Sequence, residues 1–120
     1  MSLLLSIVIG LVAFMHLYFL WFEMFQWTRL GPKIFRGFPK DLFPKTKAMA
    51  ANQGLYNGFL AAGLIWTFFI SNPAMKWQVS FFFLVCVFIA GVYGAYSVSR
   101  KIFWVQGVPA LAGIVLLHLV

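Results

Sequence analysis

Charged residues, and acidic residues above all, are scarce in this sequence. Only 9% of its 120 residues are charged, and Asp and Glu together account for 2 of them. A soluble domain has about 25% charged residues, because polar side chains must cover its surface. The single cysteine, Cys86, also excludes a disulfide-linked scaffold. These absences exclude an ordinary soluble domain and favour a protein that is surrounded by lipid.

Hydrophobic residues make up 63% of the sequence, and they occur in long runs. A helix needs about 20 consecutive apolar residues to cross the hydrocarbon core of a bilayer. Runs that reach or approach this length cover residues 3–27, 48–70, 78–97 and 103–120. Between the first two runs, residues 28–47 are polar and contain Gly and Pro residues that commonly end helices. The sequence therefore predicts a single all-α membrane domain over residues 1–120, a bundle of four transmembrane helices with a loop at 28–47.

The positions of the basic residues predict the orientation of this bundle. Of the nine Lys and Arg residues, eight lie in segments 28–47 and 98–102, and only Lys76 lies between the second and third runs. Basic loops of membrane proteins remain in the cytoplasm. We therefore expect a multi-pass protein of the cell membrane with loops 28–47 and 98–102 in the cytoplasm and both termini outside. This placement favours contact of the basic loop with anionic inner-leaflet lipids over binding of nucleic acid.

Ionisable side chains inside a predicted span are candidates for function, because each costs about 2.5–3.5 kcal/mol to insert. His16 and Glu23 are seven residues apart in the first span, which is almost two helical turns, so both project from one face. Trp27 is expected to continue that face toward the cytoplasm. The simpler alternatives are an ion pair of Glu23 with Arg29 or another loop cation, and a neutral imidazole of His16 that is hydrogen-bonded inside the bundle.

The second predicted span begins with a cluster of polar side chains. Four of them fall within an arc of about 140° on a helix, namely Asn52, Gln53, Tyr56 and Asn57. Inside a membrane such groups must be hydrogen-bonded by other helices, by water or by a ligand. Hydrogen bonds between helices are the simpler alternative, but the presence of so many carboxamides in one short stretch favours a polar pocket.

Polar side chains of all four predicted spans reach a similar depth in the cytoplasmic half of the bundle. The third span contributes Tyr93 and the fourth contributes Gln106. We therefore expect a pocket that opens to the cytoplasm or the inner leaflet, and its candidate ligand-binding residues are His16, Glu23, Trp27, Asn52, Gln53, Tyr56, Asn57, Tyr93 and Gln106.

Small residues recur at every fourth position in two of the predicted spans. The two stripes are Ala50, Gly54, Gly58 and Ala62, and Cys86, Ala90 and Gly94. Such stripes let helices approach closely, and where they are exposed they favour a homo-oligomer.

The His, Cys, Asp and Glu residues do not have the spacing of a metal site, so no metal is predicted. The cofactor is unknown, because no cofactor-binding motif is present.

Several short strings of residues resemble one family. They cover residues 16–18, 23–27, 91–95 and 106–110, and the longest runs from Asn52 to Gly63. These strings make the chain similar to the domain-of-unknown-function family 1304 over nearly its whole length. The resemblance implies a small four-span membrane protein of a bacterial or fungal cell, and it implies no particular activity. The polar positions that recur in the family correspond to His16, Glu23, Asn52, Gln53, Tyr56, Asn57, Tyr93 and Gln106.

Three functions are compatible with this pattern. The first is binding of a small amphiphile or lipid-like molecule in the polar pocket, where Glu23 or His16 would be the general acid or base of any reaction. The second is a small proton-coupled exporter, because small multidrug antiporters also have four spans and one glutamate in the first span. The third is a structural or regulatory membrane subunit without a ligand, in which the polar residues only set the register of the helices.

Overall fold

The computed structural model describes residues 1–119, and this part of the chain contains helices and no strands. The prediction of an all-α protein is therefore confirmed. The elements in chain order are α1 (Leu3–Phe25), α2 (Trp27–Ile34), α3 (Leu42–Lys45), α4 (Lys47–Thr67), α5 (Pro73–Ser97), the π-helix η1 (Phe103–Gly107) and α6 (Val108–Leu119).

Two of these helices, α1 and α5, are long and apolar enough to cross a membrane. Residues 103–119, which form η1 and α6, make a shorter apolar helix. Helix α4 is 21 residues long. It is more polar than α1 and α5, because it contains Lys47 and the carboxamides of Asn52, Gln53 and Asn57. The structure thus supports membrane association through two helices.

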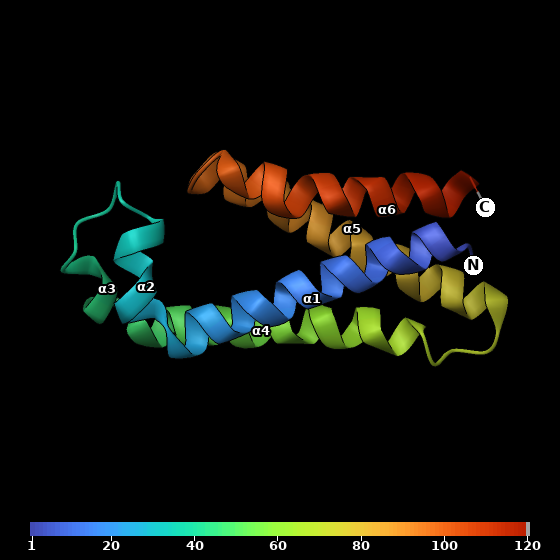
Figure 1. Cartoon of the computed structure of the whole chain (residues 1–120), viewed down its shortest axis with the longest axis horizontal. Helices are drawn as coiled ribbons and strands as arrows, with labels where there is room; N and C mark the ends of the chain where they lie inside the picture. The colour runs from blue at the N-terminus through green and yellow to red at the C-terminus, as the bar shows by residue number, and fades with distance from the viewer. Residues whose placement is uncertain (120) are drawn as a thin grey trace. The chain divides into compact units, whose positions relative to one another are not determined.

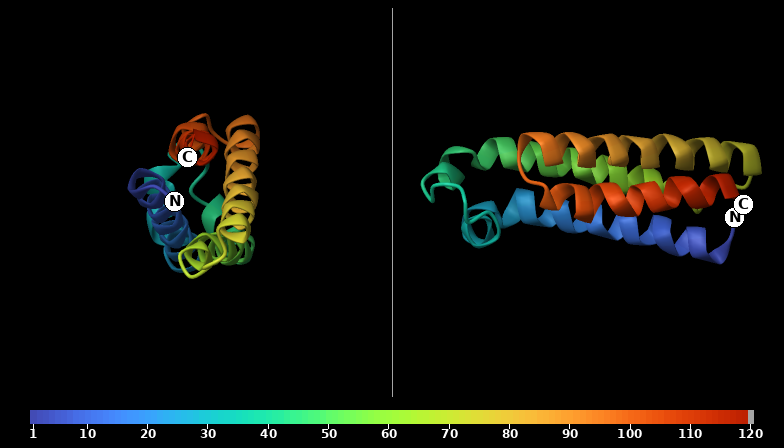
Figure 2. Two further views of the ribbon diagram at one scale, coloured as in Figure 1. Left: turned by 90° about the vertical axis from the view of Figure 1, so that its right-hand side faces the viewer. Right: turned by 90° about the horizontal axis from the view of Figure 1, so that it is seen from above.

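The described chain divides into two compact units, of which the first combines residues 1–14 with the chain from Leu60 onward. Side chains of α1, α4, α5 and α6 form the buried core of this unit. Its members are Leu5, Ile9, Val12, Ala13, Leu64, Leu84, Val87, Ala110 and Leu117. The N-terminal end of α1 and the C-terminal end of α6 lie at the same end of this unit, as Figures 1 and 2 show.

Helices α5 and α6 run side by side in opposite directions in this unit (Figure 2). Helix α5 also approaches η1 closely, since a Cβ atom on Gly91 of α5 would lie 2.6 Å from the Gly107 nitrogen of η1. The two backbones can come this close because Gly91 has no side chain. Gly91 is not part of the stripe of small residues that the sequence predicts for this helix.

The π-helical turn η1 lies directly before the segment that contains Pro109, and the chain is helical on both sides of this proline. The Val108 N–H donates to the Phe103 carbonyl, five residues earlier, instead of four as in an α-helix. A proline inside an α-helix removes one backbone hydrogen bond, and its ring collides with the carbonyl four residues before it. A wider turn directly before Pro109 avoids part of this collision, so the chain stays helical to Leu119.

Helix α5 begins at Pro73, five residues before the predicted span. The side chain of Asn72 caps the helix by accepting a hydrogen bond from the Met75 backbone N–H at 3.0 Å. Proline at the first helical position has no N–H to leave unpaired there. Asn72 and Pro73 are therefore a helix start, although the sequence reads them as a break between spans.

The second unit, residues 15–59, contains the segment that the sequence predicts to be a loop. That prediction is wrong for much of the segment, because α2 and α3 lie within it and contain Pro32 and Pro44. Pro44 is tolerated in the first turn of α3, where its missing N–H needs no partner. Helix α2 continues for two residues beyond Pro32, and the Trp27 ring at its start lies 5.9 Å from the Phe35 ring that directly follows its end.

Candidate functional site

Glu23 of α1 and Asn57 of α4 form a hydrogen bond in the second unit. The Asn57 Nδ2 donates to Glu23 Oε1 at 2.5 Å, and both residues are half-buried. The predicted proximity of the acid in the first span and the amide cluster in the second is found in this one pair of residues.

Glycine on α4 permits this contact. A Cβ atom on Gly54 would lie 2.9 Å from Met24 Cγ and 3.0 Å from Glu23 Cβ, and one on Gly58 would lie 2.5 Å from Leu20 Cδ1. Real Cβ atoms essentially never show contacts of 2.9 or 2.5 Å, so this approach of α1 and α4 depends on the missing side chains at the two glycines. The prediction that the stripe on the second span lets helices approach closely is confirmed at these two glycines.

Glu23 does not pair with a basic residue in the part of the chain that the structure describes. Arg29, the expected partner, donates from Nε to Gln26 Oε1 at 2.6 Å instead. Over residues 1–119 the one ion pair joins Lys45 to Asp41 at 3.2 Å, and both side chains are exposed. The expectation of an ion pair between Glu23 and Arg29 is thus wrong, because the side chain of Gln26, three residues before Arg29, binds the guanidinium. A neutral amide is the hydrogen-bond partner of the Glu23 carboxyl group.

The other polar residues at the start of α4 do not face this pair. Asn52, Gln53 and Tyr56 have exposed side chains, and the Tyr56 ring lies 5.9 Å from that of Phe59 on the same helix. An arc of about 140° is too wide for every member to face one neighbouring helix. Asn57 faces α1 together with the two glycines, and the ligand contacts expected of the other three residues stay predictions.

His16 lies on α1 and is completely buried. Its ring meets that of Phe19 edge-on, with centroids 5.1 Å apart and an interplanar angle of 71°. The seven-residue spacing to Glu23 lies within the one continuous helix α1. Its expected role as a ligand-binding or acid–base residue stays a prediction.

Trp27 does not continue the face of His16 and Glu23, so that prediction is wrong. Helix α1 ends at Phe25, and Trp27 is the first residue of α2. The Gln26 backbone between them is not helical, with φ −125° and ψ 9°. The Trp27 indole N–H donates to Thr46 Oγ1 at 2.9 Å, so this side chain connects α2 to the segment just before α4.

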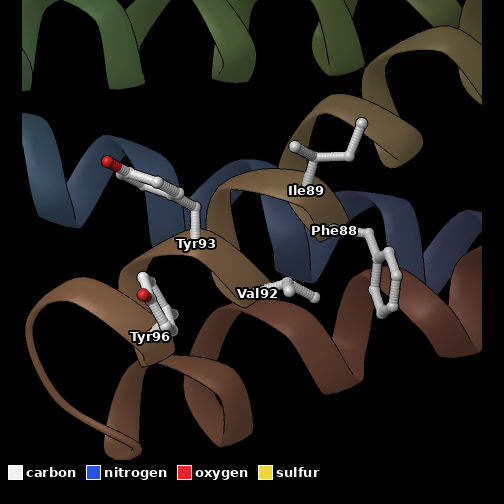
Figure 3. Close-up of a pocket in the computed structure, with 5 residues that line it drawn as sticks. All are labelled: Phe88, Ile89, Val92, Tyr93 and Tyr96. Carbon is white, nitrogen blue, oxygen red and sulfur yellow. The ribbon is translucent and has the colours of Figure 1, made fainter.

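Tyr93 and Gln106 belong to the first unit and are placed differently. Gln106 is buried in η1, at 9% exposure. The exposed Tyr93 lines an open groove of about 440 Å³ on α5 that is otherwise formed by Phe88, Ile89, Val92 and Tyr96 (Figure 3). The sequence does not predict this groove, because apolar side chains on one helix face have the same pattern whether they line a groove or contact lipid.

A metal site is not found in the described chain, since no group of three His, Cys, Asp or Glu side chains comes together in it. The Glu23–Asn57 contact in the second unit consists of one carboxyl group and one carboxamide. Such a pair can bind a cation, donate and accept hydrogen bonds, or hold a proton.

Comparison with known proteins identifies the family. The family model described as a protein of unknown function (DUF1304) matches residues 10–118. The chain is also similar to the uncharacterised protein YpaA of Lactococcus lactis subsp. lactis (strain IL1403), with 26% identity over 117 residues that cover 96% of this chain and 97% of YpaA. No solved structure matches the chain significantly. The chain belongs to the DUF1304 family.

Proposed function

We propose that this protein crosses the cell membrane four times, with both termini outside, and binds a small amphiphile through Glu23 and Asn57. The first three spans correspond to α1, α4 and α5, and the fourth to η1 with α6. The polar head of the amphiphile contacts the carboxyl group of Glu23, and its tail lies along apolar side chains and lipid.

The large number of exposed apolar side chains supports lipid as the surroundings of these helices. Along α1 they include Leu3, Ile7, Leu11, Phe14, Tyr18, Trp21 and Phe25, and along α5 they include Phe82, Ile89, Val92, Tyr93 and Tyr96. Soluble monomers rarely expose apolar patches of this length. The start of α1 and the end of α6 lie at the same end of the first unit (Figure 1). A chain whose two ends lie on the same side of a membrane crosses it an even number of times, so this arrangement supports four crossings.

The observation that carries the binding proposal is the absence of a cation beside Glu23 in the described chain. An ionised carboxylate away from water is costly unless a positive charge or several hydrogen bonds compensate it. Asn57 supplies one hydrogen bond. A ligand with a positively charged head, such as an ammonium group, supplies the missing charge.

The test is a titration of the full chain in phosphatidylcholine nanodiscs. Dodecyltrimethylammonium and dodecyl sulfate are the probes, and the bound probe is measured by equilibrium dialysis against empty nanodiscs. We expect saturable binding of the cation alone. Glu23→Gln should weaken it at least about tenfold, or about 1.4 kcal/mol. Asp41→Asn removes the other acid, which is exposed and paired with Lys45, and should leave binding unchanged. Equal binding by wild type and Glu23→Gln would contradict the proposal.

A small proton-coupled exporter is the second candidate, and the same observation favours it. A carboxyl group without a cationic side chain beside it can exchange a proton for a cationic substrate. Glu23 lies only two residues before the end of α1, however, and not at its centre. This position favours binding at one face of the membrane over alternating access from both.

A further inference from the structure

The segment between α1 and α4 has a high positive charge and is folded into two short helices. We define the basic platform as residues 27–47, which include α2 and α3. It contains six basic residues, Arg29, Lys33, Arg36, Lys40, Lys45 and Lys47, and one acidic residue, Asp41. The acid is already paired with Lys45 at 3.2 Å. The remaining cations have no acidic partner in the described chain.

Aromatic packing holds this platform in a fixed arrangement. The Trp27 ring lies 5.1 Å from the Phe43 ring and 5.6 Å from the Phe22 ring, which links α2, α3 and the end of α1. The Phe43 side chain also covers Gly31, where a Cβ atom would lie 2.5 Å from Phe43 Cδ1. Thr46 accepts the indole N–H of Trp27. The two short helices therefore lie at the junction of α1 and α4, as Figure 1 shows.

The platform exposes cations and apolar side chains together. Lys33 and Lys40 are exposed, and neither ammonium group has a hydrogen-bond partner among residues 1–119. Ile34 and Phe38 lie between them in the sequence and are exposed by 43% and 37%. Cations beside exposed apolar groups are typical of segments that lie in the interface of a membrane, where apolar groups enter the acyl boundary and cations meet phosphates.

We propose that the basic platform binds the phosphate groups of anionic phospholipids, and that its folded arrangement, as well as its charge, determines this selectivity. Arg presents a planar fork that suits phosphate oxygens, and Lys presents a point charge. The platform directly follows α1, a helix that is long and apolar enough to span a membrane. That connection and the exposed apolar side chains favour a lipid surface over a nucleic acid. This inference does not depend on Glu23.

The first test measures selectivity for the lipid head group. The full chain in dodecyl maltoside is titrated by calorimetry with dihexanoyl phosphatidylglycerol and with dihexanoyl phosphatidylcholine. We expect clearly tighter binding of phosphatidylglycerol, and a loss of about fivefold for each cation removed by Lys33→Gln and Arg36→Gln. Lys76→Gln, which removes the basic residue on α5, should have no effect. Equal affinity for the two lipids, or an equal loss with Lys76→Gln, would overturn the proposal.

A second test separates the fold of the platform from its charge. Thr46→Val removes the acceptor of the Trp27 indole N–H without changing any charge. Thr28→Val is the matched control, since Thr28 is exposed on α2 and its hydroxyl has no hydrogen-bond partner in the described chain. We expect Thr46→Val to weaken phosphatidylglycerol binding several-fold with unchanged helix content, and Thr28→Val to bind like wild type. Wild-type affinity of Thr46→Val would show that charge alone suffices and would overturn this part of the proposal.

A competition with free glycerol 3-phosphate identifies the source of the phosphate. We expect it not to displace phosphatidylglycerol at equal concentration, because it has no acyl chains to contact Ile34 and Phe38. Displacement by glycerol 3-phosphate would mean that the platform binds soluble phosphate compounds, and the membrane-surface proposal would fail.

Discussion

Asn57 Nδ2 lies 2.5 Å from Glu23 Oε1, although the two residues are 34 positions apart in the sequence. The bond joins α1 to α4 within the second unit, and Gly54 supports it by letting the two helices approach. Only one carboxylate oxygen, Oε1, is engaged by the described residues. In the proposed binding mode, the other oxygen, Oε2, meets the charged head of the ligand.

Asn57→Ala tests whether this bond orients the carboxyl group for binding. A hydrogen bond between membrane helices contributes about 0.6–2 kcal/mol, so the variant should lose about that much free energy of unfolding. Without its donor the carboxyl group can rotate, and we expect binding of dodecyltrimethylammonium to be lost while the helix content is kept. The measurements are thermal unfolding, circular dichroism and equilibrium dialysis.

Asn52→Ala is the control, because this carboxamide is exposed on the same helix. It should bind the probe like wild type. If Asn57→Ala and Glu23→Gln only lower the thermal stability and still bind the probe, the pair is a structural link between helices, and the protein is better described as a ligand-free subunit.

Proton movement tests the exporter. Purified protein in liposomes should carry protons or a cationic dye along an imposed pH gradient if Glu23 exchanges a proton for a substrate. Flux should disappear in Glu23→Gln, which cannot release a proton. A rate that does not exceed that of empty vesicles would reject the exporter and leave the binding proposal unaffected.

Cysteine labelling tests the four crossings. In a Cys86→Ala background, single cysteines replace Thr28, Ser71 and Val98, which are all exposed. A membrane-impermeant maleimide should label the cysteine at 71 in intact cells, and those at 28 and 98 only after lysis. The reason is that basic segments remain in the cytoplasm. Labelling at 98 in intact cells would mean that α5 does not cross the membrane.

Gly91→Ala tests the backbone contact in the first unit. The new Cβ atom would lie 2.6 Å from the Gly107 nitrogen, which cannot move without shifting η1. Overpacking of this kind costs about 1–3 kcal/mol, so the melting temperature should fall. Gly37→Ala is the matched control, since nothing lies within 4 Å of its Cβ position. Equal melting temperatures of the two variants would contradict the close approach of the backbones.

Trp27 shows why the end of the first helix could not be predicted. The apolar run continues to residue 27, and hydropathy alone does not separate a helix that continues from one that stops and restarts. In the structure α1 ends at Phe25, and Trp27 packs on Phe43 and bonds to Thr46, which follow 16 and 19 residues later.

The sequence predicts that the four polar residues at the start of α4 form a cluster. It does not predict which of them contacts another helix and which are exposed. Helical periodicity places Asn52, Gln53, Tyr56 and Asn57 on one broad face, but it does not say which of them meets another helix. Gly54 and Gly58 decide this, because α1 can come close only on their side. Asn57 therefore reaches Glu23, and the others remain exposed.

The amino-acid sequence by itself determined the all-helical character, the apolar nature of α1 and α5, and the candidates Glu23 and Asn57. These properties depend on each residue's own transfer free energy and on spacing along one helix, which are local quantities. Only the tertiary structure decided that Asn57, and not Arg29, bonds to Glu23, and that the basic segment folds into α2 and α3. Those outcomes depend on contacts between segments that are distant in the sequence, where the shape of the neighbouring surface determines which side chains can meet.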